Sequence, residues 1–271
     1  MTDQDPELQT VEQIYDALEG GDPESALLLA REALAQDSDD PVVRFLAGLA
    51  CLDLDRAGEA ILELQSAVKL DPDDAEFRTQ LGYALFRGCR FDDSREETSK
   101  ALEIDDTGPD AHYTAGLLAE RRGDYAEADD CFGRAHGIDA ESFPLPVRLD
   151  DAAFATTLDE ARTFLNETFR KHLDEVTVTV DELPAEAVLN ESTPPMDPEL
   201  LGLFVGVPRS EATNFSPGGE MPPQILIFKR NLERIFPDAK TLREEIVRTL
   251  HHELGHYLGL DEDELEAIDL G

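Results

Sequence analysis

The sequence predicts a chain of two parts, an α-helical solenoid over residues 7–142 and a small α+β domain over residues 152–271, joined by a linker at 143–151. Three observations predict this α + (α+β) class. Small residues recur every 34 residues in the first half. Short apolar or alternating segments in the second half predict a sheet of three to four strands. A long amphipathic helix near the end carries a His-Glu-x-x-His motif.

The first part is defined by its 34-residue period. Small residues at fixed positions let the two helices of a pair approach closely, and they recur in three series: Gly48, Gly82 and Gly116; Ala33, Ala67, Ala101 and Ala135; Ala26, Ala60, Ser94 and Ala128. The pattern resembles tetratricopeptide repeats, with four units at 7–40, 41–74, 75–108 and 109–142. The first unit has Ile14 where the glycine belongs. The resemblance implies a concave surface that binds a protein or peptide. An unrelated helical bundle is the alternative.

The second part begins after Pro144 and Pro146, which interrupt any helix and mark the linker. Residues 157–160, Thr-Leu-Asp-Glu, form a capping-box pattern, so we expect a helix from Thr157 to about His172. Its apolar side is expected to contain Leu158, Ala161, Leu165 and Phe169.

Three segments are predicted to be strands. Residues 176–180 alternate apolar and polar, which predicts a half-buried strand. Residues 200–207 are apolar with Gly202 and Gly206 inside, where glycine marks a bulge or a close backbone approach. Residues 225–228 are wholly apolar and predict a buried strand. The Pro- and Gly-rich segments 190–199 and 208–223 are expected to be loops.

The last helix carries the chemistry. His252 and His256 are four residues apart, so a helix places both imidazoles on one face, where they can bind one metal ion. Glu253 is turned away from that face and is the candidate base. Asp238 or Thr241 can cap the start of the helix, and Gly259 ends it. The alternative is a solvated polar face with incidental histidines.

A third ligand is expected close behind the motif. Only nine residues follow Glu262, and no methionine follows Met221, so we expect neither a Met-turn nor a further helix. Glu262 lies ten residues after His252, where metzincins have their third histidine. We therefore take Glu262 as the first choice for the third ligand and Asp261 as the second.

From about residue 150 onward the chain resembles a small zincin-type metallopeptidase family, once catalogued as a domain of unknown function. The last matching piece contains His-Glu-Leu-Gly-His-Tyr-Leu-Gly-Leu-Asp-Glu, close to the family pattern H-E-x-x-H-x-x-G-x-x-D. Two positions depart from the family: Glu262 stands for an aspartate, and Tyr257 occupies a position where histidine is frequent. The resemblance implies a zinc peptidase with one Zn²⁺ per chain, held by His252, His256 and Glu262.

The composition sets limits on partners. The chain is 41% hydrophobic, enough for packed cores, and its net charge of −38 would repel nucleic acid and anionic membranes. A basic protein partner for the repeats is favoured by Coulomb attraction. The three cysteines suggest no disulfide framework. Because the first residues lack a secretory signal and no apolar run approaches a membrane span, we expect a cytoplasmic protein.

Two functional hypotheses follow. In the first, the chain is a zinc metallopeptidase in which Glu253 is the general base for an activated water that attacks a peptide bond, and the repeats bind proteins or peptides. In the second, it is a non-catalytic repeat-based adaptor whose zinc unit is structural or binds peptide without cleaving it. Glu253 favours the first hypothesis, because a structural site has no use for a base beside the metal.

Overall fold

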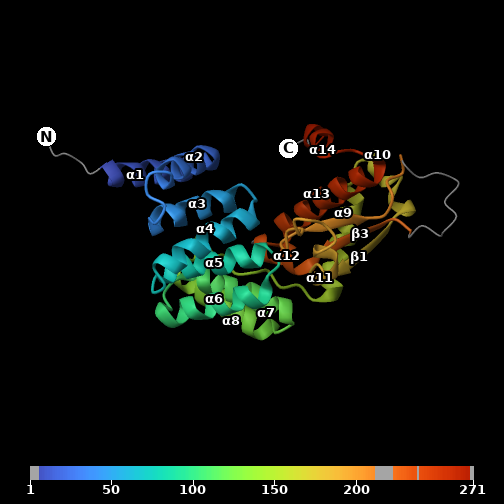
Figure 1. Ribbon diagram of the computed structural model, residues 1–271. Helices are drawn as coiled ribbons and strands as arrows, with labels where there is room; N and C mark the ends of the chain where they lie inside the picture. The colour runs from blue at the N-terminus through green and yellow to red at the C-terminus, as the bar shows by residue number, and fades with distance from the viewer. Residues whose placement is uncertain (1–5, 211–221, 237, 269–271) are drawn as a thin grey trace. The chain divides into compact units, whose positions relative to one another are not determined.

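The protein is described by a computed structural model covering residues 6–210, 222–236 and 238–268 (Figure 1). Its chain divides into two compact units. The first contains Met1–Phe143 and Glu186–Pro198, and the second contains Pro144–Ala185 and Glu199–Gly271. The segment Glu186–Pro198 therefore groups with the first half of the chain, although its neighbours in sequence belong to the second unit. The domain boundaries expected from the sequence, with a linker at 143–151 between the two domains, stay a prediction.

The first unit contains four antiparallel helix pairs (Figure 1). Each pair spans one of the predicted 34-residue units. The helices are α1 (Pro6–Glu19), α2 (Pro23–Leu34), α3 (Pro41–Asp53), α4 (Ala57–Leu70), α5 (Ala75–Arg87), α6 (Phe91–Ile104), α7 (Pro109–Arg122) and α8 (Tyr125–Ile138). The tetratricopeptide-like fold predicted from the period is confirmed, and the first unit has the same two helices as the others.

The periodic glycines lie where the paired helices touch. A methyl group added at Gly48 would come within 2.5 Å of Leu64 Cγ on the partner helix. At Gly116 it would meet Phe132 at the same distance. The small residues recur every 34 residues because, at these positions, the facing helix leaves no room for a larger side chain. Ile14, which replaces the glycine in the first pair, is fully buried in the same core.

The second unit is built on a three-stranded sheet of order β1-β3-β2. Strand β1 is Thr177–Asp181, β2 is Gly202–Val205 and β3 is Gln224–Phe228. The central strand β3 pairs with β1 in parallel and with β2 in antiparallel register. All three predicted strands are present, and β2 is an edge of the sheet in the part of the chain that the structure describes.

Helices α9 (Asp151–Phe164) and α13 (Ala239–Leu258) pack side by side in the second unit (Figure 1). The shorter elements are α10 (Glu167–Arg170), η1 (Leu173–Glu175), α12 (Lys229–Ile235) and α14 (Glu262–Ile268). The core of this unit joins the predicted apolar side of α9 and α10 to Ile225 and Ile227 of β3 and to Ile246, Leu250 and Leu254 of α13. Helix α13 therefore packs against both the sheet and α9.

The predicted start and end of the first helix in this unit were wrong. The helix begins at Asp151, because the side chain of Asp150 accepts a hydrogen bond from the Ala153 N–H and caps it there. Thr157, the expected cap, lies inside the helix, and its hydroxyl donates to the Ala153 carbonyl. The helix ends at Phe164, and Asn166 caps the separate helix α10. The expectation of no helix after the motif was also wrong, since α14 follows at Glu262.

Part of the predicted loop at 208–223, residues 211–221, lies outside the described residues. No helix in the parts of the chain that are described is both long and apolar enough to cross a membrane.

Candidate metal centre

The helix that carries the motif is fixed at both ends. Asp238, one of the two predicted caps, accepts hydrogen bonds from the N–H groups of Lys240 and Thr241. At the other end Gly259 is left-handed, with φ 92°, and the N–H of Leu260 donates to the Gly255 carbonyl. This is a Schellman ending, which glycine adopts without steric cost. The helix therefore runs through both motif histidines and reverses the chain three residues later.

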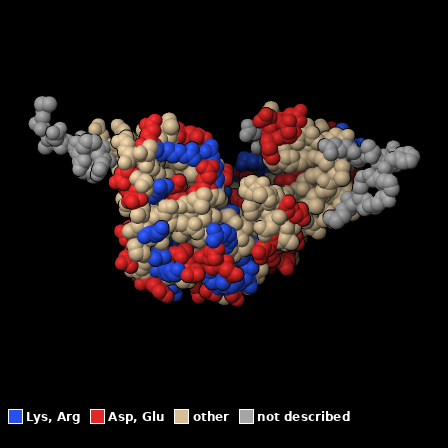
Figure 2. Space-filling view, in the orientation of Figure 1, with Lys and Arg blue, Asp and Glu red and all other residues tan. Residues whose placement is uncertain are grey.

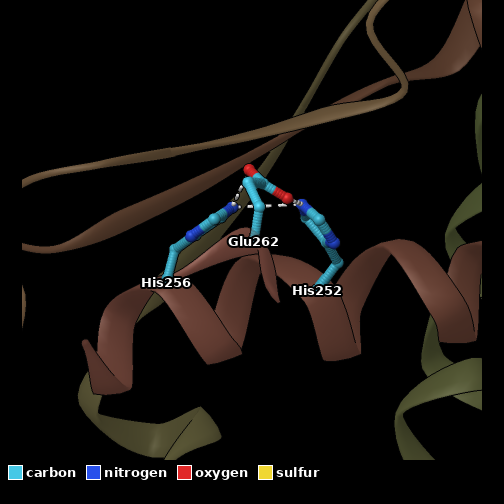
Figure 3. Close-up of side chains that lie close together, drawn as sticks. All are labelled: His252, His256 and Glu262. Carbon is cyan, nitrogen blue, oxygen red and sulfur yellow. Dashed lines mark hydrogen bonds and ion pairs between the residues drawn. The ribbon is translucent and has the colours of Figure 1, made fainter. Parts of the chain in front are cut away.

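The two imidazoles and one carboxylate converge in front of this helix (Figure 3). The Nε2 atoms of His252 and His256 are 3.0 Å apart. The Glu262 carboxylate lies 3.7 Å from the first and 3.3 Å from the second. A tetrahedral zinc ion with bonds of about 2.0–2.1 Å separates its ligand atoms by about 3.3 Å. The three side chains have the spacing of a zinc ligand set.

The backbone partner of His256 also fits a metal ligand. Its Nδ1 lies 3.3 Å from the Leu260 carbonyl oxygen. A carbonyl only accepts, so the tautomer with its proton on Nδ1 satisfies this contact and leaves the Nε2 lone pair toward His252 and Glu262. A backbone carbonyl is a common partner for the outer nitrogen of a metal-binding histidine. The Schellman ending supplies this partner, because it brings Leu260 back beside the last turn.

The two candidates for the third ligand, Asp261 and Glu262, differ in the hydrogen bonds and ion pairs that they form. Asp261 accepts a hydrogen bond from the Glu264 N–H, and Glu264 accepts one from the Asp261 N–H. This reciprocal capping box starts α14 and directs the Asp261 carboxylate to its own helix. Glu262, the next residue, makes no such local hydrogen bond within the described part of the chain and faces the imidazoles (Figure 3). The Asp-x-x-Glu pattern at 261–264 is the sequence signal that could have favoured Glu262.

Helix α14 is held close to α13 at Gly255. A Cβ added there would lie 2.2 Å from Leu265 Cδ2, and Leu265 is only 5% exposed. The glycine inside the motif therefore makes room for the side chain that anchors α14. Because Glu262 begins α14, this contact helps to place its carboxylate over the two histidines.

Glu253, the candidate base, is 6% exposed and lies beneath the edge strand. A Cβ at Gly202 of β2 would be 2.5 Å from Thr249 Cγ2 and 3.3 Å from Glu253 Cγ, so the strand crosses the helix in close contact. A backbone hydrogen bond from Phe204 stabilises the carboxylate. Burial outweighs it and, with the nearby charge of Glu262, raises the pKa of Glu253 to about 7.

The start of β2 is fixed by buried polar side chains of α12. The Asn231 amide, fully buried, donates to the Leu200 carbonyl over 2.6 Å. Arg234 donates to both Asn231 and Glu199. Sequence reasoning missed this helix and its role, since the segment Lys-Arg-Asn-Leu-Glu-Arg has the composition of an exposed surface.

A cleft of about 490 Å³ lies in front of the histidines. One wall is formed by β2 and the residues around it, and the other by α13 and the turn into α14. Its lining includes His252, Glu253, His256 and Glu262, with apolar side chains from Leu200, Leu203, Phe204, Pro208 and Leu260. The candidate ligands and base therefore face an open, partly apolar space that a substrate could enter.

The remaining histidines lie away from this cluster. His251 accepts a hydrogen bond from the Asn166 N–H and packs edge-on against Phe169. His112, His136 and His172 have partners elsewhere in the fold. Tyr257 is 7% exposed and donates its hydroxyl to Glu175. Its phenol is thus part of the core of the second unit and lies outside the ligand cluster.

Comparisons with known proteins agree with the two halves of the fold. Residues 173–271 match the family described as zincin-like metallopeptidase, and residues 17–77 and 59–109 match two tetratricopeptide repeat families. The chain therefore combines tetratricopeptide repeats with a zincin-like metallopeptidase domain. No curated protein matches it.

Solved structures similar to the chain include two of MamA. The crystal structure of MamA has 22% identity and a TM-score of 0.42, covering 46% of this chain and 73% of that one. MamA 41-end from Desulfovibrio magneticus RS-1 has 20% identity and a TM-score of 0.45, covering 50% of this chain and 76% of that one.

Proposed function

We propose that this protein is a zinc-dependent peptidase, with His252, His256 and Glu262 as the ligands of one Zn²⁺ and Glu253 as the general base. The observation that carries the proposal is the convergence of two imidazole nitrogens and a carboxylate within 4.8 Å of one another, beside a buried carboxylate and an open cleft. The zincin-like family match over residues 173–271 supports it.

The chain's own residues have distinct parts in the proposed reaction. When bound, zinc supplies a Lewis acid that polarises a carbonyl and lowers the pKa of a water. Glu253 takes the proton of the attacking water on its carboxylate and passes it to the leaving amine nitrogen. An extended peptide would lie along the edge strand β2, whose Phe204 N–H already donates to Glu253, and this would hold the scissile bond in the cleft.

The cleft also indicates the class of peptide. Five of its lining residues are large apolar side chains or proline, contributed by β2, its flanks and Leu260. Burial of an apolar side chain contributes about 25 cal/mol per Å² of area removed from water. We therefore expect cleavage next to an apolar residue of the substrate.

The repeats are proposed to bind a protein or peptide, in keeping with their family. Figure 2 shows acidic side chains over both units, with Lys and Arg interspersed. The net charge of −38 favours a basic partner, and added salt would weaken such binding. A cytoplasmic location also remains part of this proposal.

The first test is the metal content of the purified protein. After dialysis, elemental analysis of the wild type should give about one zinc per chain. The His252→Ala variant should lose it. The His251→Ala variant is the matched control, because this adjacent histidine bonds to Asn166 outside the cluster, and it should keep its zinc. A wild type that takes up no zinc would refute the site, and the adaptor hypothesis would replace it.

The second test addresses catalysis. The Glu253→Gln variant keeps the shape of the side chain, so it should bind zinc like the wild type. Hydrolysis of a peptide library should fall by about 10²–10⁴-fold, the usual contribution of a general acid–base group. Hydrolysis by this variant at the wild-type rate would show that Glu253 is not the base. Zinc binding without hydrolysis in the wild type would favour the adaptor.

A further inference from the structure

The segment Glu186–Pro198, called here the crossover segment, groups with the repeats although it connects two strands of the second unit. It includes the short helix α11 (Glu186–Leu189) and closes on itself through a hydrogen bond from the Met196 N–H to the Leu189 carbonyl. Leu189 and Pro198 are buried, and Leu189 has no exposed surface at all. The segment thus has an anchored face rather than the exposure of an ordinary loop.

Arg87, the last residue of α5, forms an ion pair with this segment. Its guanidinium lies 2.9 Å from Asp197 of the crossover segment and 2.8 Å from Asp55 of the second repeat. Its side chain is only 17% exposed, so the ion pair with Asp197 is partly shielded from water. A shielded pair between a repeat and a residue more than 100 positions away is a specific docking contact.

Cys89, two residues further on, lies under the same segment. Its thiol donates to the Met196 carbonyl at 3.4 Å, and its residue is 9% exposed. Burial raises the pKa of Cys89 to about 11, and the charges of Asp197 and Glu186 act on it as well. The charge of Glu186 also acts on Arg121 of α7. The direct contacts, made by Arg87 and Cys89, both belong to the third repeat.

The crossover segment is joined to the cleft by very short chains. Three residues lie between Pro198 and Gly202, the first residue of β2, and this connection spans at most about 14 Å. Four residues lie between Asp181, the end of β1, and Glu186, a span of at most about 18 Å. Residues 199–201, which α12 also holds through Asn231 and Arg234, are thus a short covalent link between the docked segment and β2, the strand that lies against Glu253.

We propose that the repeats bind the crossover segment as a ligand in cis, through the surface formed by Arg87 and Cys89, and that this docking steadies the edge strand β2 of the cleft. A partner that displaces the segment from this surface would loosen β2. The docking itself does not depend on the proposed peptidase activity, and both of its parts can be measured without a substrate.

Docking is tested by the reactivity of Cys89 in the full-length protein. Alkylation with iodoacetamide, followed by mass spectrometry, compares Cys89 with Cys51, which is 1% exposed in the repeat core and has a pKa raised by burial to the same value, about 11. We expect Asp197→Asn and Leu189→Ala each to raise the Cys89 rate at least tenfold with Cys51 unchanged. Leu189→Ala alters no charge, so its effect reports exposure of the thiol. Asp55→Asn removes the other partner of Arg87 and should leave the rate unchanged.

The steadying of β2 is tested by hydrogen exchange in the same variants. Amide exchange of peptides that contain Gly202–Val205 should be several-fold faster in Asp197→Asn and Leu189→Ala than in Asp55→Asn. If neither variant increases alkylation of Cys89, the docking is refuted. If Cys89 becomes reactive while exchange in β2 is unchanged, the coupling to the cleft is refuted. Neither alkylation of Cys89 nor hydrogen exchange in β2 requires zinc or a substrate. A wild type that binds no zinc or cleaves no peptide would therefore refute the proposed function without affecting these two tests.

Discussion

Replacing Gly202 with alanine tests whether the edge strand must lie against the motif helix. The added Cβ would stand 2.5 Å from Thr249 Cγ2, 3.2 Å from the Leu226 carbonyl oxygen and 3.3 Å from Glu253 Cγ. Ordinary carbon contacts are about 3.5–4.0 Å, so the strand or the helix must move by about 1 Å. The threonine is branched at Cβ and stiff within a helix, and the carbonyl belongs to the sheet, so neither gives way easily.

The cost can be estimated from this overlap. Overpacking a buried contact destabilises a protein by about 1–3 kcal/mol. Gly202 has a backbone conformation that other residues adopt, so no conformational strain adds to this figure. A shift of about 1 Å next to the base would reduce hydrolysis by about 10²-fold under the proposed mechanism. Zinc should be retained, because the three candidate ligands come from α13 and α14.

Urea unfolding and zinc analysis measure these effects. The control is Gly133→Ala in α8, where nothing lies within 4 Å of the added carbon and helix propensity should stabilise by about 1 kcal/mol. If Gly202→Ala unfolds at the urea concentration of the wild type and its β2 amides exchange at the same rate, the close approach of strand and helix is wrong. Loss of zinc from this variant would contradict the assignment of ligands to the two helices.

Three further outcomes are expected. Glu262→Gln should weaken zinc binding in competition with a chelator, whereas Asp261→Asn, which preserves the helix cap, should not; the reverse result would make Asp261 the ligand. Gly255→Ala should weaken zinc binding about 10–100-fold by displacing α14, and adding Leu265→Ala should restore part of the affinity; no recovery would disprove the packing argument. Gly48→Ala should lower the melting temperature of the repeats, because overpacking costs about 1–3 kcal/mol and helix propensity returns only about 1; an unchanged value would refute the tight helix contact.

The sequence predicts those features of the fold that depend on periodicity. The 34-residue spacing of small residues predicted four helix pairs, because such residues repeat wherever paired helices touch. The alternating and apolar segments predicted all three strands. The ends of helices were harder to predict from the sequence, because a single capping side chain determines where a helix begins. Asp150 begins α9 where the capping-box pattern at Thr157 predicted a later start.

Contacts between distant parts of the chain leave no local pattern. The pair of Arg87 and Asp197 joins a repeat to a segment more than 100 residues away, and nothing near either residue indicates the other. The same holds for Asn231, a buried polar residue in a charged segment, which holds Leu200 at the rim of the cleft. The assignment of the ligands and the base stays a prediction, although the predicted residues lie together.

The geometry of the candidate centre depends on three glycines as well as on its polar residues. The missing side chain of Gly202 lets β2 approach α13, and that of Gly255 leaves room for Leu265 of α14. Gly259 takes the left-handed conformation that turns the chain back toward the histidines. Gly202 lies in β2, Gly255 within α13 and Gly259 at the end of α13, so each glycine makes room for a different contact. The spacing of His252 and His256 brings together two ligand atoms, whereas the third ligand and the substrate cleft require these close approaches. A His-Glu-x-x-His helix without them would present two histidines to solvent and nothing more.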